Sequence, residues 1–461
     1  MESKEKVSTT GSVSVVGLGK LGAPMAAALA SKAFQVVGVD ADPAKVELLR
    51  LGRAPVSETG LSELISQNQQ QLAAGSSVEE AVEKTDVTFI VVGTPSEQGG
   101  NFSLKYVLPV CESIGRALQK KSSFHLVVLT STVTPGSTSG PVKQLLEKTS
   151  GKRCGGDFGL CYSPEFIALG SVIRDFLNPD FVLIGESDTR SGEMLETLYK
   201  RACDSNPAVA RMNFINAEIT KLAVNSYVTT KISFANMLAR ICERAAGADV
   251  DVVSAALGLD SRIGTRYLKG AIGYGGPCFP RDNRALASFA GSLEADAGLA
   301  QATHQFNQAQ AEWLANFVEE LSAKQPVGIL GLTYKPDTDV VDEAVGLLLA
   351  QALASRGLSV MVYDPAGMPA ARRISGSPSA KITFSGSAAE CIAASQTVVV
   401  TTPWRQFSDI SLETWAAGDS PRTVVDCWRA LKHLANRESI RYIALGRGPA
   451  EGSARSALNL V

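Results

Sequence analysis

Two blocks of this chain alternate short runs of β-branched and other apolar residues with longer stretches of helical periodicity. In the first block, buried parallel strands are predicted at residues 13–16, 36–40, 87–92, 126–130 and 181–184. In the second block, they are predicted at residues 327–330, 360–363, 398–401, 424–426 and 442–445. Such alternation is typical of doubly wound sheets that carry helices on both faces. We therefore predict two α/β domains.

The stretch between these blocks has a different pattern. The alternation is expected to stop after Asn206, and residues 213 to about 257 carry apolar side chains at helical spacing, which predicts one long helix or two in sequence. A chain of 461 residues is also too long for one core. We predict an α/β domain over residues 11–210, a central helical segment over 211–322 and a C-terminal α/β domain over 323–461.

Composition excludes several classes of protein. A formal net charge of -2, with 45% hydrophobic and 20% charged residues, favours neither a nucleic-acid binder nor a disordered chain. The first ten residues are polar and no later run approaches the length of a membrane span, so we expect a soluble, cytoplasmic protein. The eight cysteines lack CxxC spacing, so neither disulfides nor a metal site is expected.

The first predicted strand leads into a glycine-rich turn. The turn reads Gly17-Leu18-Gly19-Lys20-Leu21-Gly22 and precedes a helical stretch, and Asp40 ends the next strand. Gly17 makes the tight turn, Gly19 lets the backbone approach a pyrophosphate, and Gly22 allows close packing of helix and strand. Asp40 can bind the ribose hydroxyls of NAD but would repel a 2′-phosphate. The alternative is a tight turn that binds no ligand.

Two further features bear on the cofactor. Lys45 is the only nearby cation that would tolerate a 2′-phosphate, although an ordinary exposed helix charge explains it equally well. In the second block, the strand runs into Gly331 and then Lys335 without the second and third glycines of a dinucleotide turn. We therefore predict that only the first domain binds NAD.

Eight short motifs follow one another along the chain. They are Val92-Gly93-Thr94-Pro95, Ser131-Thr132-Val133, Ser163-Pro164-Glu165-Phe166, Ala217-Glu218 with Lys221 and Asn225, Arg262-Ile263-Gly264, residues 273–282, residues 331–336, and Thr402 with Trp404. With this set, nearly the whole chain resembles the UDP-glucose/GDP-mannose dehydrogenase family. The resemblance implies an N-terminal Rossmann NAD-binding domain, a central helical dimerisation segment and a C-terminal Rossmann-like domain for a nucleotide sugar. It also implies a homodimer or higher homo-oligomer.

Cys278 lies in the sequence Gly-Tyr-Gly-Gly-Pro-Cys-Phe-Pro-Arg-Asp. Oxidation of an alcohol to a carboxylate with two hydride transfers needs an aldehyde-level intermediate that does not escape. A thiolate meets this need, because it forms a thiohemiacetal and then a thioester that water hydrolyses. The alternative for Cys278, and our preferred interpretation of the other seven cysteines, is a small buried hydrophobe. Asp282 lies four residues on and would share a helical face with Cys278, or else cap a helix or pair with Arg281 or Arg284.

Lys221 and Asn225 are four residues apart, so a helix would present both on one face. By the resemblance, they stabilise the alkoxide and the oxyanions of the reaction. The resemblance likewise implies that Glu165 and Thr132 activate or position the water of thioester hydrolysis. The alternatives are a solvated lysine on a polar helix surface and, for Glu165, a carboxylate at a helix start.

The resemblance assigns further residues to the two ligands. For NAD they are Thr94, Thr132 and Arg281, beside the glycine-rich turn, Asp40 and Lys45. For the nucleotide sugar they are Glu165, Phe166, Ile167, Lys221, Asn225, Arg262, Tyr267, Lys269, Gly275, Phe279 and Lys335. A lysine that follows a strand, such as Lys335, would equally serve as a surface charge.

The chain departs from the usual family pattern at three places. Leu169 stands where a glutamate is common, Asp342 where an arginine is expected to contact NAD, and residues 426–429 read Asp-Cys-Trp-Arg in place of Asp-Gly-Arg-Asn. These changes leave the choice of sugar and the affinity for NAD open.

Two rival functions remain at this level. One is a single-step hydroxyacid dehydrogenase of the 6-phosphogluconate type, which would neither need Cys278 nor explain a second α/β domain. The other is a degenerate NAD-binding protein without activity, against which the joint presence of Cys278, Lys221, Asn225, Asp282 and Glu165 argues.

Overall fold

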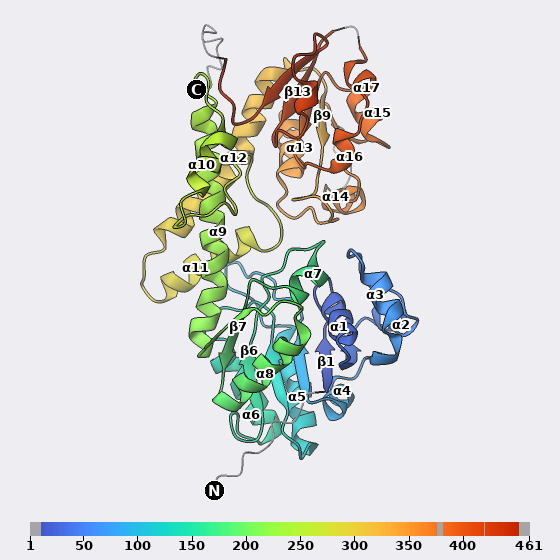
Figure 1. Cartoon of the computed structure of the whole chain (residues 1–461), viewed down its shortest axis with the longest axis vertical. Helices are drawn as coiled ribbons and strands as arrows, with labels where there is room; N and C mark the ends of the chain where they lie inside the picture. The colour runs from blue at the N-terminus through green and yellow to red at the C-terminus, as the bar shows by residue number, and fades with distance from the viewer. Residues whose placement is uncertain (1–10, 376–380, 419, 451–461) are drawn as a thin grey trace. The chain divides into compact units, whose positions relative to one another are not determined.

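The computed structural model describes residues 11–375, 381–418 and 420–450. The chain divides into two compact units, Met1–Ala223 and Val224–Val461 (Figure 1).

The first unit is built on an eight-stranded sheet in the order β3-β2-β1-β4-β5-β6-β7-β8. Its strands are β1 (Ser12–Val16), β2 (Gln35–Val39), β3 (Leu72–Gly75), β4 (Val87–Ile90), β5 (Leu126–Leu129), β6 (Gly159–Tyr162), β7 (Phe181–Glu186) and β8 (Ala208–Met212). Its helices are α1 (Gly22–Ser31), α2 (Pro43–Arg50), α3 (Leu61–Gln67), α4 (Val78–Lys84), α5 (Val107–Lys120), α6 (Lys143–Ser150), α7 (Val172–Leu177) and α8 (Thr189–Ala202). Short helical turns span Gln69–Gln71 and Thr138–Val142.

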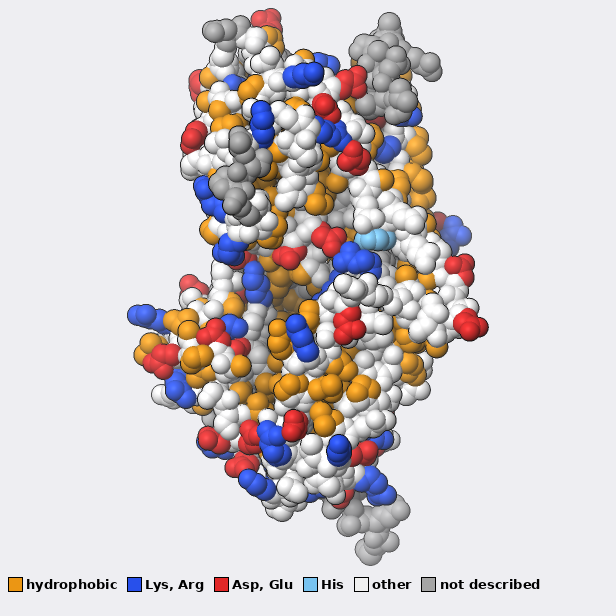
Figure 2. All heavy atoms as spheres, turned by 180° about the vertical axis from the view of Figure 1, so that it is seen from behind, with side chains coloured by type: hydrophobic (Ala, Val, Ile, Leu, Met, Phe, Trp, Pro, Cys, Tyr) orange, Lys and Arg blue, Asp and Glu red, His pale blue; other side chains and the backbone are white. Residues whose placement is uncertain are grey.

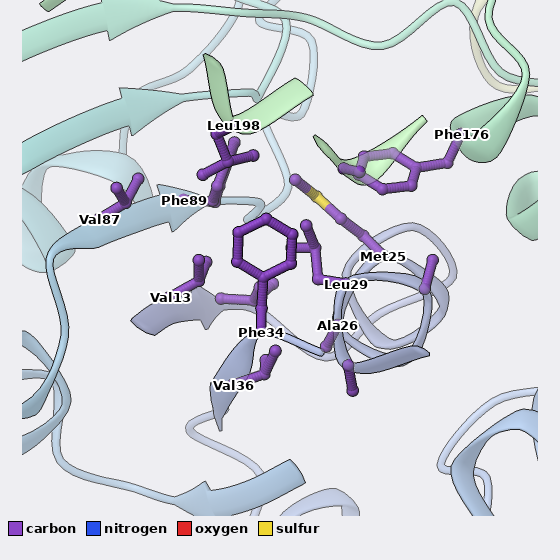
Figure 3. Packing of buried hydrophobic residues seen from close by; sticks show 14 of the residues in the cluster. Val13, Met25, Ala26, Leu29, Phe34, Val36, Val87, Phe89, Phe176 and Leu198 are labelled. Carbon is purple, nitrogen blue, oxygen red and sulfur yellow. The ribbon is translucent and has the colours of Figure 1, made fainter. Parts of the chain in front are cut away.

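Helix α1 packs tightly on this sheet. Met25 and Leu29 of α1 lie against Phe34 and against the valine side chains of β1 and β2, with Phe89 of β4 close by (Figure 3). All of these side chains are fully buried. Because burial of each large apolar side chain contributes about 1.5–3 kcal/mol, this packing fixes α1, and with it the glycine-rich turn before it, on the sheet.

The predicted strands of the first block are present, but their direction is wrong at one place. Strand β7 runs antiparallel to β6, with Tyr162 opposite Gly185, whereas we predicted a parallel strand. The alternation also does not stop after Asn206, because β8 follows and pairs with β7 in parallel. An apolar run indicates a buried strand but carries no information on strand polarity, and β8 is only partly buried and so lacks the apolar run of the other strands.

The helices of the central segment follow as expected. Two helices in sequence, α9 (Phe214–Cys242) and α10 (Val250–Gly258), occupy the stretch for which one or two helices were predicted. They are followed by α11 (Phe279–Ser292) and α12 (Gly298–Ser322). Nearly all of this segment, from Val224 on, belongs to the second unit.

A six-stranded, all-parallel sheet in the order β11-β10-β9-β12-β13-β14 completes the second unit. Its strands are β9 (Val327–Leu330), β10 (Val360–Tyr363), β11 (Ile382–Phe384), β12 (Thr397–Val400), β13 (Arg422–Asp426) and β14 (Ile440–Ala444). Its helices are α13 (Val345–Ser355), α14 (Met368–Ser375), α15 (Ala388–Ala393), α16 (Arg405–Ser408) and α17 (Leu412–Ala416), with a short turn at Lys432–Leu434. The five predicted strands are confirmed, and β11 was missed because it has only three residues.

The surface is chemically mixed. Figure 2 shows acidic and basic side chains interspersed over the visible face, in keeping with the small net charge. Within the described ranges, none of the helices combines the length and the apolar character needed to cross a bilayer.

Candidate active site

The glycine-rich turn has the geometry that a dinucleotide requires. Gly17 has a φ of +105°, and a Cβ at Gly22 would stand 1.8 Å from the carbonyl oxygen of Gly17. Beside Gly19, by contrast, the chain leaves open space around a Cβ position. Helix α1 has neither a side-chain cap nor an acidic residue in its first turn, so its N-terminal amides suit an anion. These residues fit NAD.

Asp40 closes this loop from the end of β2. Its carboxylate accepts hydrogen bonds from the main-chain N–H groups of Leu18, over 2.7 Å, and Asp42, over 2.8 Å. Lys45 lies 3.4 Å from the same carboxylate, so it pairs with Asp40 rather than standing as an isolated helix charge. The carboxylate is partly exposed and retains acceptor capacity for ribose hydroxyls.

The second sheet has the same kind of turn, but the acidic residue beside it, Asp364, already accepts hydrogen bonds from its own domain. Gly331 has a φ of +106°, and a Cβ at Gly346 would lie 2.0 Å from its carbonyl oxygen. Leu332 donates to Asp364 over 2.7 Å, as Leu18 does to Asp40. Asp364, however, is 1% exposed and also accepts from Trp404 and from neighbouring main-chain amides. It has no capacity left for a ribose, which supports our prediction that the dinucleotide binds only to the first domain.

Glu165 lies between β6 and α7, seven residues before that helix begins, so it is not a carboxylate at a helix start. Tyr199 of α8 donates a hydrogen bond to its Oε1 over 3.0 Å. Burial raises the pKa of Glu165 to about 7, although the Tyr199 hydrogen bond and the charge of Lys221 lower it. A carboxylate with a pKa near 7 is suited to accept and release a proton at neutral pH.

Lys221 of α9 is anchored beside Glu165. Its Nζ donates to the main-chain carbonyl of Glu165 over 2.6 Å and lies 4.5 Å from the centroid of the Phe166 ring. The lysine is 6% exposed, which excludes the alternative of a solvated surface charge. Thr132, after β5, accepts at its carbonyl a 2.7 Å hydrogen bond from the Thr94 hydroxyl.

Asn225 lies one turn along α9 from Lys221 and binds Asp282 of α11. Its Nδ2 donates to Oδ2 of Asp282 over 2.6 Å. Asp282 is fully buried, and Arg281 lies 3.4 Å from its other oxygen. Arg284 pairs with Glu343. The carboxylate of Asp282 is therefore bound by the amide of Asn225 at one oxygen and lies beside Arg281 at the other.

Cys278 is the N-cap residue of α11 and is exposed. The main-chain N–H of Asp282 donates to its carbonyl over 2.8 Å, so the predicted helical turn between the two residues is present. The N-terminus of a helix favours a thiolate. The other seven cysteines are buried, as expected, and burial raises the pKa of the Cys111 thiol to about 12.

The loop before Cys278 is clamped by amide side chains. Asn236 of α9 accepts from the N–H of Ala271 and donates to the carbonyl of Ile272, each over 2.8 Å. Asn307 of α12 binds both main-chain groups of Tyr274, over 2.7 and 2.9 Å. The glycines are required here, since a Cβ at residue 275 would lie 2.4 Å from the carbonyl oxygen of residue 343.

Three consecutive segments match known domain families. They match the UDP-glucose/GDP-mannose dehydrogenase family as its NAD binding domain over residues 11–203, its central domain over residues 215–309 and its UDP binding domain over residues 328–433. This chain belongs to the UDP-glucose/GDP-mannose dehydrogenase family. Membership makes it an NAD-dependent oxidoreductase of the nucleotide-sugar dehydrogenase class, acting on CH–OH groups, and confirms the resemblance found in the sequence.

Individual relatives agree. UDP-glucose 6-dehydrogenase AglM of Haloferax volcanii is 34% identical over 439 residues, 94% of this chain and 99% of that protein. GDP-mannose 6-dehydrogenase of Pseudomonas syringae pv. syringae is 35% identical over 358 residues, 76% of this chain and 80% of that protein. A solved UDP-glucose dehydrogenase from Pyrobaculum islandicum has a TM-score of 0.86 at 33% identity and covers 96% of this chain and 99% of that one.

The remaining predicted ligand residues of the dehydrogenase are spread over both units. In the first unit, Phe166 packs on Phe181 with 4.8 Å between ring centroids, and Ile167 contacts the main core. In the second unit, Tyr267 has a φ of +64° and makes an edge contact with Phe279 at 6.4 Å. Arg262 pairs with Asp260, Lys269 is exposed and Lys335 is partly buried.

The structure shows the surroundings of three residues that depart from the usual family pattern. Leu169 lies beside a turn that Glu58 holds by accepting from the N–H groups of residues 170 and 172. Asp342 is exposed and contributes its main-chain carbonyl to the N–H of residue 276. The Arg429 side chain is fully buried and pairs through two nitrogens with Asp251, so it is not available to an anionic ligand.

Some residues that shape the site were missed. Tyr199, Asn236, Asn307 and Arg429 contact the predicted residues or their loops, but each lies in an amphipathic helix or after a strand, where its side chain looks like ordinary core. Lys221 and Asn225 were found because they are four residues apart in one helix. No such local spacing links the missed residues to the site.

Proposed function

We propose that the dehydrogenase oxidises the C6 alcohol of a UDP-linked hexose to the uronate in two steps, through a thiohemiacetal and a thioester on Cys278. The observation that carries this proposal is the position of Cys278. It is the exposed cysteine among eight, it caps the N-terminus of α11, and the buried Asp282 follows one turn later. Exposure and a helix N-terminus are the conditions under which a thiol acts as a nucleophile.

Residues of the first unit and of α9 supply the charge stabilisation. When bound at the glycine-rich turn, NAD accepts a hydride from the substrate carbon. Lys221 and Asn225 face the same side of α9 and donate to the oxygen on which negative charge develops. Asp282 orients the Asn225 amide by the 2.6 Å hydrogen bond.

Glu165 serves the hydrolysis of the thioester. Its pKa of about 7 allows it to take a proton from water, and Thr132 positions that water. The water oxygen then bonds to the thioester carbon, the C–S bond breaks, and the electron pair leaves on Sγ of Cys278. Phe166, Ile167, Arg262, Tyr267, Lys269, Gly275, Phe279 and Lys335 are proposed to bind the nucleotide sugar, and Thr94 and Arg281 to bind NAD.

The choice of UDP over GDP rests on structural likeness. The solved UDP-glucose dehydrogenase has a TM-score of 0.86 over 96% of this chain, whereas a solved GDP-mannose dehydrogenase has a TM-score of 0.53 over 94% of it. Residues 328–433 match the UDP binding domain of the UDP-glucose/GDP-mannose dehydrogenase family. The rival single-step hydroxyacid chemistry would leave this domain without a role.

We further propose that the dehydrogenase is a cytoplasmic homodimer joined through α9 and α10. The exposed side chains of Tyr227, Phe234 and Ile241 recur every seven residues along α9, so they form one apolar stripe. Leu259, after α10, is 85% exposed. Light scattering at micromolar concentration should give the dimer mass, and Phe234→Glu with Ile241→Glu should give the monomer. A monomeric wild-type protein would contradict this proposal.

The central test combines a substrate panel with Cys278→Ser. UDP-glucose, UDP-N-acetylhexosamines and GDP-mannose are each mixed with NAD, and NADH formed per sugar consumed is counted. Two NADH per sugar are expected with UDP-glucose, whereas one would favour the single-step rival.

Cys278→Ser should bind both ligands but fail to turn over, because an ester on serine hydrolyses far less readily than a thioester. Cys391→Ser, a buried cysteine, is the control. Near-normal turnover by Cys278→Ser would disprove the thioester route, and no turnover of any sugar would favour the inactive NAD-binding protein.

A further inference from the structure

A chain of buried hydroxyl groups ends on the carboxyl group of Glu165. Tyr199 donates to Glu165 Oε1 over 3.0 Å, and the Ser163 hydroxyl lies 3.1 Å from the Tyr199 hydroxyl. The one hydroxyl proton of Ser163 is donated either to the Tyr199 oxygen or to the main-chain carbonyl of Leu183 in β7, which lies 3.0 Å away. Ser163 is 1% and Tyr199 2% exposed, so these hydroxyl groups are shielded from bulk water. The hydrogen bonds of a shielded chain are stronger than those at the surface.

The aromatic ring of Tyr199 is fixed by packing. It makes an edge contact with Phe89 of β4 at 6.5 Å between centroids and a tilted contact with Phe176 of α7 at 6.2 Å. All three rings belong to the main core of the first unit. The position of the Tyr199 hydroxyl is therefore set by the fold, and a phenylalanine would occupy the same place without the hydroxyl.

Glu165 is held from two sides. Lys221 of α9 binds its main-chain carbonyl over 2.6 Å, and Tyr199 of α8 binds its side chain at Oε1. The first contact fixes the backbone and the second fixes the plane of the carboxyl group. Glu165 itself is only partly buried, so water can reach it.

We propose that Tyr199 is a positioning residue for thioester hydrolysis, which holds Oε1 of Glu165 so that Oε2 takes the proton of the attacking water, while Ser163 keeps the Tyr199 hydroxyl directed at the glutamate. This inference rests on the proposed function, in which Glu165 is the base. In the step itself, one water proton passes to Oε2 and the hydroxide oxygen bonds to the thioester carbon. The C–S bond breaks and the sulfur of Cys278 leaves as a thiolate.

The chain of hydroxyl groups keeps its hydrogen bonds in both protonation states of Glu165. A carboxylate accepts the Tyr199 proton at Oε1, and a carboxylic acid protonated on Oε2 still accepts it there. Ser163 has a second acceptor in the carbonyl of Leu183, so its own proton keeps a partner in either state. No hydrogen bond of the chain needs to break when the glutamate gains or loses its proton.

The pH dependence of hydrolysis provides a readout that a purely structural tyrosine would not change. The groups that act on the charge of Glu165 are Lys221 from α9 and Tyr199 of α8, and Glu165 in turn raises the pKa of Cys203, the residue after α8. Burial raises the pKa of Glu165, and the Tyr199 hydroxyl opposes this by stabilising the carboxylate. Its removal should raise the pKa further, by about one unit. The acidic limb of the hydrolysis rate should then move to higher pH.

The test uses Tyr199→Phe in the full-length enzyme, with UDP-glucose and NAD as probes between pH 6 and pH 9. The acyl-enzyme is followed by quenching and intact mass, and NADH by absorbance. We expect an unchanged first burst of NADH, an accumulating thioester, about fivefold lower kcat at pH 7 that recovers toward pH 9, and a KM that falls in parallel with kcat, so that kcat/KM stays near wild type. Tyr442→Phe is the matched control, because it removes the hydroxyl of a partly buried tyrosine that donates to Asp426 over 2.8 Å. A Tyr199→Phe enzyme with the wild-type pH profile and no accumulated thioester would overturn the inference.

Two further variants separate the inference from the function on which it rests. Glu165→Gln with wild-type hydrolysis would remove Glu165 from the mechanism, and the inference would fall with it. If Glu165→Gln accumulates thioester while Tyr199→Phe behaves as wild type, only the inference is wrong. Should Tyr199→Phe fail to fold, Ser163→Ala decides, since it should shift the acidic limb in the same direction by a smaller amount. If the acidic limb of the hydrolysis rate is not shifted in Ser163→Ala, the proposed role of the chain of hydroxyl groups is contradicted.

Discussion

Gly22 lies so close to Gly17 that a Cβ on Gly22 would stand 1.8 Å from the carbonyl oxygen of Gly17. Gly19, three residues before Gly22, has nothing within 4 Å of the corresponding position. Two glycines of one motif therefore serve different ends. One is required by the packing of α1 on the sheet, and the other leaves space that the fold itself does not fill.

This contrast predicts opposite behaviour of two alanine variants. Gly22→Ala should be destabilised by about 1–3 kcal/mol or more, because the clash is with backbone that cannot move aside. Gly19→Ala should fold with wild-type stability but lose most of its affinity for NAD, because its methyl group occupies the space through which a pyrophosphate approaches. Thermal unfolding and a titration with NAD measure the two effects. Tight NAD binding by Gly19→Ala would show that the loop does not approach the pyrophosphate there.

A second prediction concerns the cost of keeping Glu165 partly buried. Its pKa in the folded protein is about 7, above the ordinary value of 4.5 for a glutamate, so the folded form disfavours the carboxylate. The sign follows from linkage: the stability of the folded state is highest when the group is protonated and falls as the pH rises through about 7. Glu165→Gln should therefore be more stable than wild type by roughly 2–3 kcal/mol at pH 8 and by clearly less at pH 5. Urea unfolding at both pH values measures this, with exposed Glu63→Gln as the control. An equal effect at both pH values would contradict the raised pKa.

Much of this site was predictable because its residues lie at fixed spacings in single elements. The turn of residues 17–22, the Lys221 and Asn225 pair and the Cys278 to Asp282 turn each depend on local geometry that a sequence displays. Tyr199 could not be found in this way. Its hydroxyl reaches Glu165 from a helix that follows by more than thirty residues, and the aromatic ring alone explains its place in the core.

Prediction of the fold from the sequence has the same limit, because local patterns do not show tertiary contacts. The strands themselves were predicted from apolar runs, but the antiparallel direction of β7 depends on how the chain returns between β6 and β7. That connection contains the short α7 and no signal of strand polarity. Likewise, Arg429 stands where the usual family pattern has an asparagine, and its pairing with Asp251, 178 positions earlier, is a tertiary contact that no local pattern reveals.

A third prediction concerns His125, which is fully buried in the first unit. Its Nδ1 faces the carbonyl of Thr85 over 2.9 Å and must carry the proton, so Nε2 accepts from the Thr88 hydroxyl over 2.8 Å. Burial, aided by the charge of Lys121, lowers the pKa of His125 to about 3. The neutral form is therefore required for folding, and the stability it confers is complete above the unfolded pKa of about 6.5 and is lost as the pH falls toward 3.

Replacement of His125 should accordingly change the acid sensitivity of the protein. Between pH 7 and pH 4, the wild type should lose more unfolding free energy than His125→Gln, by up to a few kcal/mol. Exposed His433→Gln should follow the wild type. Urea transitions at half-unit steps of pH measure the difference. Parallel curves for wild type and His125→Gln would show that the histidine is already protonated in the fold or that it gains little from burial.

The last prediction concerns Asn236, which clamps the loop that leads to Cys278. Asn236 is 1% exposed, and its amide satisfies the N–H of Ala271 and the carbonyl of Ile272 at once. In Asn236→Asp the donor becomes an oxygen that faces the Ile272 carbonyl, so one buried hydrogen bond is lost and two acceptors confront each other. Loss of a buried hydrogen bond with an unsatisfied partner costs about 1–3 kcal/mol. The loop should shift, and misplacement of a reacting group by about 1 Å can lower the rate on the order of 10²-fold.

The matched control is Asn216→Asp, which makes the same change at an exposed position of the same helix. We expect kcat with UDP-glucose to fall about 10²-fold in Asn236→Asp and to stay near wild type in Asn216→Asp. The affinity for NAD should be unchanged in both, because the glycine-rich turn belongs to the first unit and Asn236 to the second, and because the Asn216 side chain is exposed. A large loss of NAD affinity in Asn236→Asp would indicate general misfolding, and wild-type kcat would show that the geometry of residues 271–274 does not control the reactivity of Cys278.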